Sequence, residues 1–454
     1  MQQLIDRYCR FDRTGADGVR YQTTTAVALV ENGLLHKIPA AIDPFVRPGP
    51  IAIVCDAITR GIAADALDAL LQHAGFKTVL FELAPSPGEE IPNCDDATID
   101  RVGALLATAD FGFAIAVGAG SLNDLVKMAA HRLSLPYACV ATAPSMNGFT
   151  SSIAAILSDG VKTTQPCTPP IAVFADPVIL AAAPYRMIAS GIGDLYSKPV
   201  SNADWRLAHR LLDQPHSSIV MEIVEAGSAL LDGVAERLPA RDLDAVAKLA
   251  GALMLSGLAM QAAGNSGPAS GGEHLISHYI DMTSVAFGES HDFHGCQVAV
   301  GTIVTSRLYE YLAAQDPATF DIEARVAALP SWEEKSASID RDFGPLAPAV
   351  REHARKIHPT PDALRARLTR LRDNWDSIIA DVSTTLRPSA ELEAELISAH
   401  CPTRFPEIGV TRERARRAVV LSRDIRARFT ILHLAADLGL LEPFADLEMA
   451  RAFG

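Results

Sequence analysis

Two short segments concentrate the residues that could do metal chemistry. They are Gly272-Glu-His-Leu-Ile-Ser-His278 and Ser290-His-Asp-Phe-His-Gly295, which hold four of the thirteen histidines of the chain. His274 and His278 are four positions apart, so on a helix they share one face. His294 follows His274 by twenty positions. A single histidine is ordinarily a cap or a satisfied core residue, but imidazole is also the commonest ligand of zinc, nickel and iron, so the cluster indicates a metal site.

A carboxylate would complete such a site. Asp194 lies in Ala189-Ser-Gly-Ile-Gly-Asp-Leu195, after two glycines, where we expect it to project from the start of a helix. One aspartate and two histidines leave coordination positions open for a substrate oxygen, as a Lewis-acid centre requires. Asp194 is therefore the candidate carboxylate ligand for a site of one aspartate and two histidines.

A glycine turn offers a second site, for phosphate. Val117-Gly-Ala-Gly-Ser-Leu-Asn-Asp124 follows an apolar run and leads into a helical pattern. Glycines let the backbone approach a phosphate, and the N–H groups at a helix start attract anions. Ser121 and Asp124 have the spacing of a capping pair, which supports a helix starting there. Asn123 replaces the third glycine of the dinucleotide motif, so a tight structural turn and a nucleotide site remain equally open.

The first third of the chain alternates short apolar runs with helical patterns, which predicts βαβ units and a parallel sheet. The predicted strands span 51–55, 78–81, 113–117, 137–141 and 171–175. Beyond about Asp176, helical periodicity dominates. We therefore predict an α/β, parallel-sheet dinucleotide-binding domain over residues 1–176, followed by an all-helical metal and substrate domain over residues 177–454. A cleft between two domains is a favoured ligand site.

Asp56 follows the first predicted strand and could accept hydrogen bonds from ribose hydroxyls, which would favour NADH. It could equally be an ordinary cap of the next helix.

Composition limits the partners. The 54 acidic and 40 basic residues give a net charge of −14, which argues against nucleic acid. Seven scattered cysteines without a CxxC pair indicate reduced thiols, and the N-terminal segment lacks the apolar core of a signal peptide. The apolar stretch 249–263 is short for a membrane span and contains Ser256 and Gln261, which favours a buried core helix. We expect a cytoplasmic protein with no membrane insertion.

Five ordered motifs resemble those of a known family. They are Gly118-Ala-Gly-Ser-Leu-Asn-Asp-Leu, Thr142-Ala-Pro-Ser-Met-Asn-Gly148, Ala183-Pro-Tyr-Arg-Met-Ile-Ala-Ser-Gly-Ile-Gly-Asp-Leu195, Asp204-Trp-Arg-Leu-Ala-His209 and Glu273-His…His294-Gly. The sequence is similar to the sn-glycerol-1-phosphate dehydrogenases, especially their bacterial branch, within the superfamily of iron-containing alcohol dehydrogenases and dehydroquinate synthases. The resemblance runs from about residue 20 to the segment Ile425–Leu432.

The resemblance implies reduction of a small phosphorylated ketone, dihydroxyacetone phosphate, to sn-glycerol 1-phosphate. The implied cofactors are NAD or NADP and one divalent ion (zinc, nickel or iron), and a homodimer is implied. Asp194, His274 and His294 would hold the ion, Asp194 and His278 would be catalytic, and His278 would hold a substrate oxygen or relay a proton. The residues implied to lie against the nicotinamide cofactor are Gly118, Gly120, Ser121, Asn123, Asp124, Thr142, Ser145 and Ser151, with Asp56 added from its strand-end position.

One residue departs from the family pattern. Asn147 stands where the family typically has an aspartate that holds a substrate hydroxyl beside the metal. Asparagine accepts a hydrogen bond but carries no charge and also donates. Three outcomes follow: weaker binding of the same substrate, a different small polar ketone or alcohol, for example one presenting a carboxylate, or a catalytically inactive nucleotide-binding homologue. A phosphate-eliminating cyclase is a further rival, but that class typically carries glutamate at the position of Asp194.

Overall fold

The computed structural model describes residues 1–86, 88–158 and 161–454, and the chain divides into two compact units. The first unit comprises Met1–Leu195 and Ser217–Pro268, and the second comprises Tyr196–His216 and Ala269–Gly454. The predicted boundary at residue 176 coincides with the end of the last sheet strand, whereas the compact units divide elsewhere. The helices between Pro177 and Leu195, and those between Ser218 and Ala263, group with the sheet.

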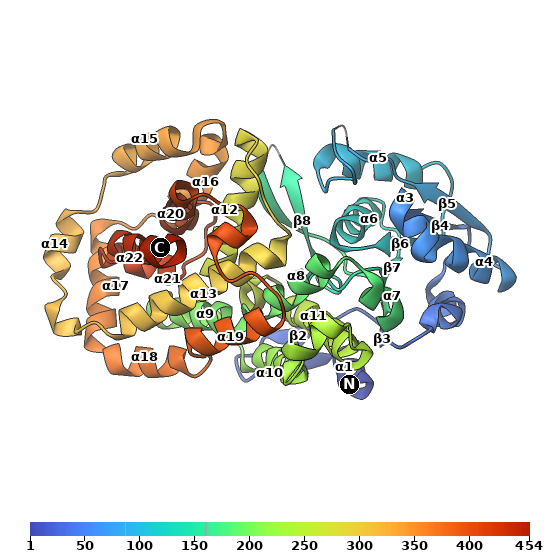
Figure 1. Ribbon diagram of the computed structural model, residues 1–454, viewed down its shortest axis with the longest axis horizontal. Helices are drawn as coiled ribbons and strands as arrows, with labels where there is room; N and C mark the ends of the chain where they lie inside the picture. The colour runs from blue at the N-terminus through green and yellow to red at the C-terminus, as the bar shows by residue number, and fades with distance from the viewer. Residues whose placement is uncertain (87, 159–160) are drawn as a thin grey trace. The chain divides into compact units, whose positions relative to one another are not determined.

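The first unit is built on a six-stranded sheet in which every pairing is parallel (Figure 1). The order is β3-β10-β7-β6-β4-β5, with bounds β3 Val27–Val30, β10 Ala172–Ala175, β7 Tyr137–Ala141, β6 Phe113–Gly118, β4 Ile51–Cys55 and β5 Thr78–Glu82. Strands β4, β6, β7 and β10 are buried along their whole length, which explains why they read as continuous apolar runs. The predicted parallel α/β fold is confirmed.

The connections of this sheet define a place for a ligand. From β4 the chain passes through α3 (Ala57–Thr59) and α4 (Asp65–His73) to β5 at one edge. It then returns through α5 (Asp96–Leu106) to β6, on the other side of β4, and continues into α6 (Gly120–Arg132). The strand order therefore reverses between β4 and β6. In open α/β sheets, ligands bind outside the carboxyl ends of the strands at such a switch point.

Some strands of the first unit were not predicted. Strand β3 is an edge strand of four residues, of which only Ala28 and Val30 are buried, so it does not form a continuous buried run. Two antiparallel hairpins also lie outside the alternating pattern, formed by β1 (Asp12–Thr14) with β2 (Arg20–Gln22) and by β8 (Ile153–Ser158) with β9 (Val161–Pro166).

The remaining helices of the first unit are α1 (Gln2–Tyr8), α2 (Ile38–Ile42), α7 (Pro177–Ala182), α8 (Tyr185–Leu195), α10 (Ser218–Ser228) and α11 (Leu243–Ala263). Among the described residues, α11 alone has the length and hydropathy of a membrane span. However, 78% of its apolar window is buried inside the protein. It is apolar on all sides because it packs as a core helix, as the sequence predicts.

The described residues of the second unit form helices and no strand. They are α9 (Lys198–Leu212), α12 (Gly272–Phe287), α13 (His294–Ala313), α14 (Ile322–Ala327), α15 (Trp332–Phe343), α16 (Ala347–Ile357), α17 (Pro361–Asp373), α18 (Trp375–Ser383), α19 (Ser389–Ser398), α20 (Arg412–Leu421), α21 (Ile431–Asp437) and α22 (Leu441–Phe453). Helices α12 and α13 approach closely because position 301 is glycine. A Cβ on Gly301 would lie 2.5 Å from the carbonyl oxygen of Glu273.

Candidate functional site

Three histidines converge on helices α12 and α13. The ring centroids of His274 and His294 are 5.2 Å apart, and those of His278 and His294 are 5.5 Å apart with nearly parallel planes. His274 and His278 are buried and lie on one face of α12, with ring centroids 6.0 Å apart. The shared face of His274 and His278 that their spacing predicts is confirmed.

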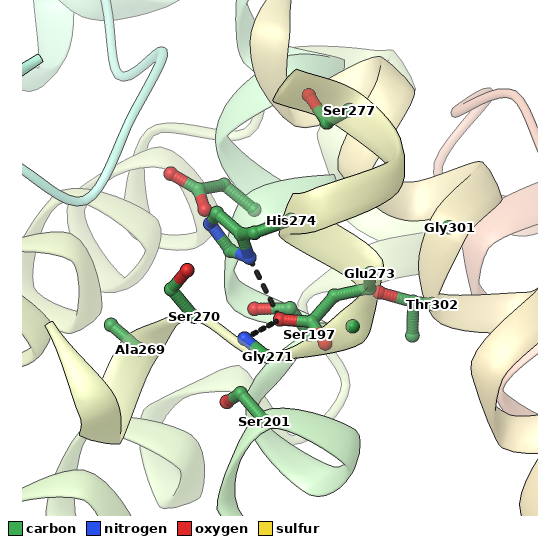
Figure 2. Close-up of polar contacts among 12 residues, drawn as sticks. Ser197, Ser201, Ala269, Ser270, Gly271, Glu273, His274, Ser277, Gly301 and Thr302 are labelled. Carbon is green, nitrogen blue, oxygen red and sulfur yellow. Dashed lines mark hydrogen bonds and ion pairs between the residues drawn. The ribbon is translucent and has the colours of Figure 1, made fainter. Parts of the chain in front are cut away.

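The two histidines predicted as ligands each have a defined partner at Nδ1. The Nδ1 atom of His274 lies 2.7 Å from Oε1 of Glu273, as Figure 2 shows, and Nδ1 of His294 lies 3.1 Å from Oγ of Ser277. When Nδ1–H donates to such a partner, Nε2 is the nitrogen that can coordinate an ion. Ser277 is itself fixed by a 3.2 Å hydrogen bond from the amide of Gln297. The two imidazoles are therefore oriented for coordination by outer contacts.

Asp194 lies in the last turn of α8, at the opposite end of the helix from the one predicted. The first of its two preceding glycines, Gly191, serves packing instead of a helix start. A Cβ on Gly191 would overlap the carbonyl oxygen of Pro144, so glycine lets α8 press against the loop that carries Asn147. Ser190 adds a 2.8 Å hydrogen bond from its hydroxyl to the carbonyl of Ser145.

The side chain of Asp194 is held by Asn147. The backbone N–H of Asn147 donates to Oδ2 of Asp194 at 2.8 Å, and its side-chain amide donates to Oδ1 at 2.9 Å. Asp194 is 1% exposed and Asn147 is 8% exposed. The residue that departs from the family pattern is thus in direct contact with the predicted carboxylate ligand.

The glycine turn lies where the sequence predicts, between β6 and α6. Helix α6 begins at Gly120, and its N-cap residue, Ala119, has no side chain that could cap the helix. A Cβ on Gly120 would lie 2.9 Å from Cγ of Met146, so glycine is needed for the close approach of the two segments. The predicted capping pair of Ser121 and Asp124 is wrong. The uncapped N–H groups at the start of α6 suit a phosphate anion.

Asp124 points instead to the interior of the first unit. One of its oxygens lies 3.0 Å from Nζ of Lys127, and the other accepts the N–H of Ala155 at 3.0 Å. Asp56 caps α3, accepting the N–H groups of Ile58 at 3.0 Å and Thr59 at 2.7 Å. The cap interpretation of Asp56 therefore holds. Direct contacts of Asp56 and Asp124 with a cofactor remain predictions.

Sequence reasoning missed Lys127. Its fully buried ammonium group donates to Gly148 O at 2.8 Å, Ile153 O at 3.0 Å and Ser151 Oγ at 3.3 Å, besides Asp124. Lys127 thus ties α6 to the loop that carries Asn147. The spacing of Asp124 and Lys127, three residues apart among apolar residues of one helix, could have indicated a buried ion pair.

Two further carboxylates of the second unit were not assigned a role, although both lie in quoted motifs. Glu273 is fully buried beside His274. Asp204 accepts the hydroxyl of Tyr309 at 2.6 Å and the N–H of Gly272 at 2.7 Å. Burial, together with the nearby Glu273 carboxylate, raises the pKa of Asp204 to about 7. These acids form a buried polar cluster around the start of α12.

The donor atoms present fit a divalent transition metal. Asp194 of the first unit offers a carboxylate oxygen, and His274 and His294 of the second unit each offer an imidazole nitrogen. A carboxylate with two imidazoles suits zinc, nickel or iron, and three protein ligands leave positions open.

Comparisons with known proteins agree with this chemistry. Residues 30–184 match the family model for iron-containing alcohol dehydrogenases. The chain is 34% identical to an NAD(P)+ glycerol-1-phosphate dehydrogenase of Halalkalibacterium halodurans, over 65% of this chain and 70% of the relative. It is 33% identical to one of Geobacillus thermodenitrificans, over 77% of this chain and 90% of the relative.

Solved structures show the same fold. Glycerol dehydrogenase from Schizosaccharomyces pombe matches with a TM-score of 0.61 at 16% identity, over 94% of this chain and 92% of that chain. An iron-containing alcohol dehydrogenase from Thermotoga maritima matches with a TM-score of 0.56 at 13% identity, over 92% of this chain and 99% of that chain. The chain therefore belongs to the glycerol-1-phosphate dehydrogenase family of iron-containing alcohol dehydrogenases, and it is an NAD(P)-dependent, metal-dependent dehydrogenase acting on a small molecule.

Proposed function

We propose that the protein reduces dihydroxyacetone phosphate to sn-glycerol 1-phosphate with NADH or NADPH. The relatives named above support this substrate. The observation that carries the proposal is the arrangement of Asn147 beside Asp194, because it bears on the one residue at which the sequence departs from the family.

The orientation of the Asn147 amide follows from its partner. A carboxylate only accepts hydrogen bonds, so the NH2 group of Asn147 must face Asp194, and its carbonyl oxygen must point elsewhere. That carbonyl is an acceptor which a substrate hydroxyl can use, as the family aspartate would be. A substrate carboxylate offers no proton to it. The contact therefore favours a hydroxyl-bearing ketone over a keto acid.

We assign the ion to Asp194, His274 and His294. A divalent ion there supplies Lewis acidity to a ketone oxygen and stabilises the charge that develops on it during hydride transfer. The chain's own residues orient the reactants. His278, on α12, lies beside His294 at the start of α13. We propose that His278 holds the substrate oxygen or delivers a proton to it.

The nicotinamide cofactor is assigned to the switch point of the sheet. Gly118, Gly120, Ser121 and the start of α6 would bind its pyrophosphate, because that helix start has no side-chain cap. Asn123, Asp124, Thr142, Ser145 and Ser151 are buried and would form the wall of this site, with Lys127 holding Asp124 and Ser151 in place.

The test is the oxidation of NADH and of NADPH by the metal-reconstituted protein with dihydroxyacetone phosphate. A chelator-sensitive rate, with chirally pure sn-glycerol 1-phosphate as product, is expected. Protein that binds metal and cofactor but shows no rate would overturn this substrate, and a panel of keto acids and other small ketones would then separate a different substrate from an inactive homologue.

We also propose that the enzyme is a cytoplasmic homodimer. The seven cysteines are all free thiols, as expected in a reducing compartment. Sedimentation at twice the chain mass would support the dimer, and sedimentation at the mass of one chain would contradict it.

A further inference from the structure

Glu273 contacts the predicted metal ligand that follows it in the chain. Its Oε1 atom lies 2.7 Å from Nδ1 of His274 and accepts the backbone N–H of Gly271 at 2.7 Å (Figure 2). The Gly271 bond fixes the carboxylate from the other side, so the acceptor presented to the imidazole has a defined position.

Burying the Glu273 carboxylate costs free energy. Glu273 is fully buried, and its other oxygen, Oε2, has no hydrogen-bond partner among the described residues. A second carboxylate lies nearby, because a Cβ on Gly271 would be 2.8 Å from Glu273 Oε2 and 2.6 Å from Asp204 Oδ2. An ionised carboxylate buried beside another acid costs several kcal/mol unless it is compensated. Arg428, which is partly buried, favours both acids electrostatically, but it does not explain why one of them faces an imidazole.

The two proposed histidine ligands are held differently. Nδ1 of His274 lies 2.7 Å from a carboxylate oxygen, whereas Nδ1 of His294 lies 3.1 Å from the neutral hydroxyl of Ser277 and 3.9 Å from the Asp281 carboxylate, which is beyond hydrogen-bond distance. A carboxylate that accepts Nδ1–H fixes the tautomer of a ligand histidine, orients its ring and makes Nε2 a stronger donor to the metal. The stronger effect is therefore expected at His274.

We propose that Glu273 is a positioning residue that sets the tautomer and orientation of His274 and strengthens its bond to the divalent ion. This inference rests on the proposed assignment of His274 as a ligand. It assigns to Glu273 a part in metal affinity, separate from any contact with substrate or cofactor.

The experiment measures zinc affinity of the metal-stripped full chain by competition with a chromophoric chelator. Glu273→Ala should bind zinc about 10- to 100-fold more weakly than the wild type. Glu273→Gln should fall between them, because glutamine keeps an acceptor oxygen but loses the charge. NADH affinity, measured by fluorescence quenching, should not change in either variant.

Glu448→Gln is the matched control. Glu448 is also a buried carboxylate of the second unit, but it pairs with Arg307 at 2.8 Å instead of a histidine. This variant should retain the zinc affinity of the wild type, so a loss confined to the Glu273 variants cannot come from removing any buried acid.

The outcomes separate the two proposals. If the wild type binds no zinc, or if His274→Ala binds as tightly as the wild type, the metal assignment fails. If His274→Ala loses affinity while Glu273→Ala does not, only the role of Glu273 is overturned. Should Glu273→Ala not fold, the 15N shifts of His274 in the metal-free wild type decide: a proton on Nδ1 supports the proposal, and a proton on Nε2 refutes it.

Discussion

Asn147 holds both carboxylate oxygens of Asp194, one through its backbone N–H at 2.8 Å and the other through its side-chain amide at 2.9 Å. The amide gives Asp194 a neutral donor at the position where the family typically has an acid. The pair can therefore stay close whether or not an ion is bound, since no second negative charge faces the ligand.

Asn147→Asp should make the pair depend on metal. The substitution removes a hydrogen bond to a charged group, worth about 1.5–3 kcal/mol, and places two carboxylates face to face. Without metal, the unfolding free energy of the variant should be lower than that of the wild type by at least this much. Zinc should then stabilise the variant more than it stabilises the wild type. Urea unfolding with and without zinc measures both quantities.

Asn147→Ala is the control for this substitution, because it removes the same bond without adding charge. It should destabilise the metal-free protein less than Asn147→Asp. Equal losses in the two variants would mean that charge repulsion plays no part.

Removal of a ligand should abolish turnover and leave the fold intact. Asp194→Ala and His274→Ala should each lower kcat/KM by about 1,000-fold or more, since a Lewis acid contributes several kcal/mol to transition-state stabilisation. Initial rates with dihydroxyacetone phosphate, compared with circular dichroism spectra, test this expectation.

His291→Ala is the matched control for the ligand variants. His291 is an exposed histidine three positions before His294 and belongs to no predicted ligand set. It should retain the wild-type rate. Substantial activity in Asp194→Ala would contradict the ligand assignment.

The features that could be predicted from sequence were those encoded by local spacing. His274 and His278 converge because four residues are about one helical turn, and strands such as β4 and β6 are recognisable because burial on both faces makes them continuously apolar. Chemical type alone made His294 and Asp194 candidates, since no local period connects them to His274, and the family resemblance then implied that they are ligands.

Features that depend on distant contacts could not be predicted. The glycines before Asp194 suggested a helix start, but Gly191 serves the packing of α8 against Pro144, which lies 47 positions earlier in the chain. Asp124 has the spacing of a cap but pairs with Lys127 and binds Ala155, because the hairpin of β8 and β9 returns to α6. Glycine can mark a helix start or allow close packing, and aspartate can cap a helix or form a buried ion pair. Only the tertiary contact shows which of these a given residue does.

Lys127→Met should destabilise the first unit strongly. The ammonium group of Lys127 is fully buried, so its removal leaves the Asp124 carboxylate without its counter-ion and deprives the carbonyls of Gly148 and Ile153 of a donor. Breaking a buried pair in this way costs about 3–5 kcal/mol. The free energy of urea unfolding measures this loss.

Lys248→Met provides the comparison. Lys248 also pairs with an aspartate on its own helix, Asp244 at 3.1 Å, but its side chain is 32% exposed and that of Asp244 is 60% exposed. Exposed pairs of this kind contribute about 0.3–0.5 kcal/mol. A Lys127→Met loss as small as that of Lys248→Met would show that the buried ammonium group does not hold the loop.

His216 should make stability fall in acid. Burial beside Trp205, followed by the positive charges of Arg206 and His209, lowers the pKa of His216 from 6.5 to about 4. As the pH falls through 6.5, the unfolded chain takes up a proton that the folded protein does not, so unfolding becomes easier, and the effect ends below about pH 4. The slope for this one group is at most about 1.4 kcal/mol per pH unit.

His216→Gln should therefore lose less stability than the wild type between pH 7 and pH 4.5 in urea unfolding, because the carboxylates that titrate in both proteins cancel in the difference. Parallel pH profiles for the two proteins would show that His216 is protonated equally in the folded and unfolded states.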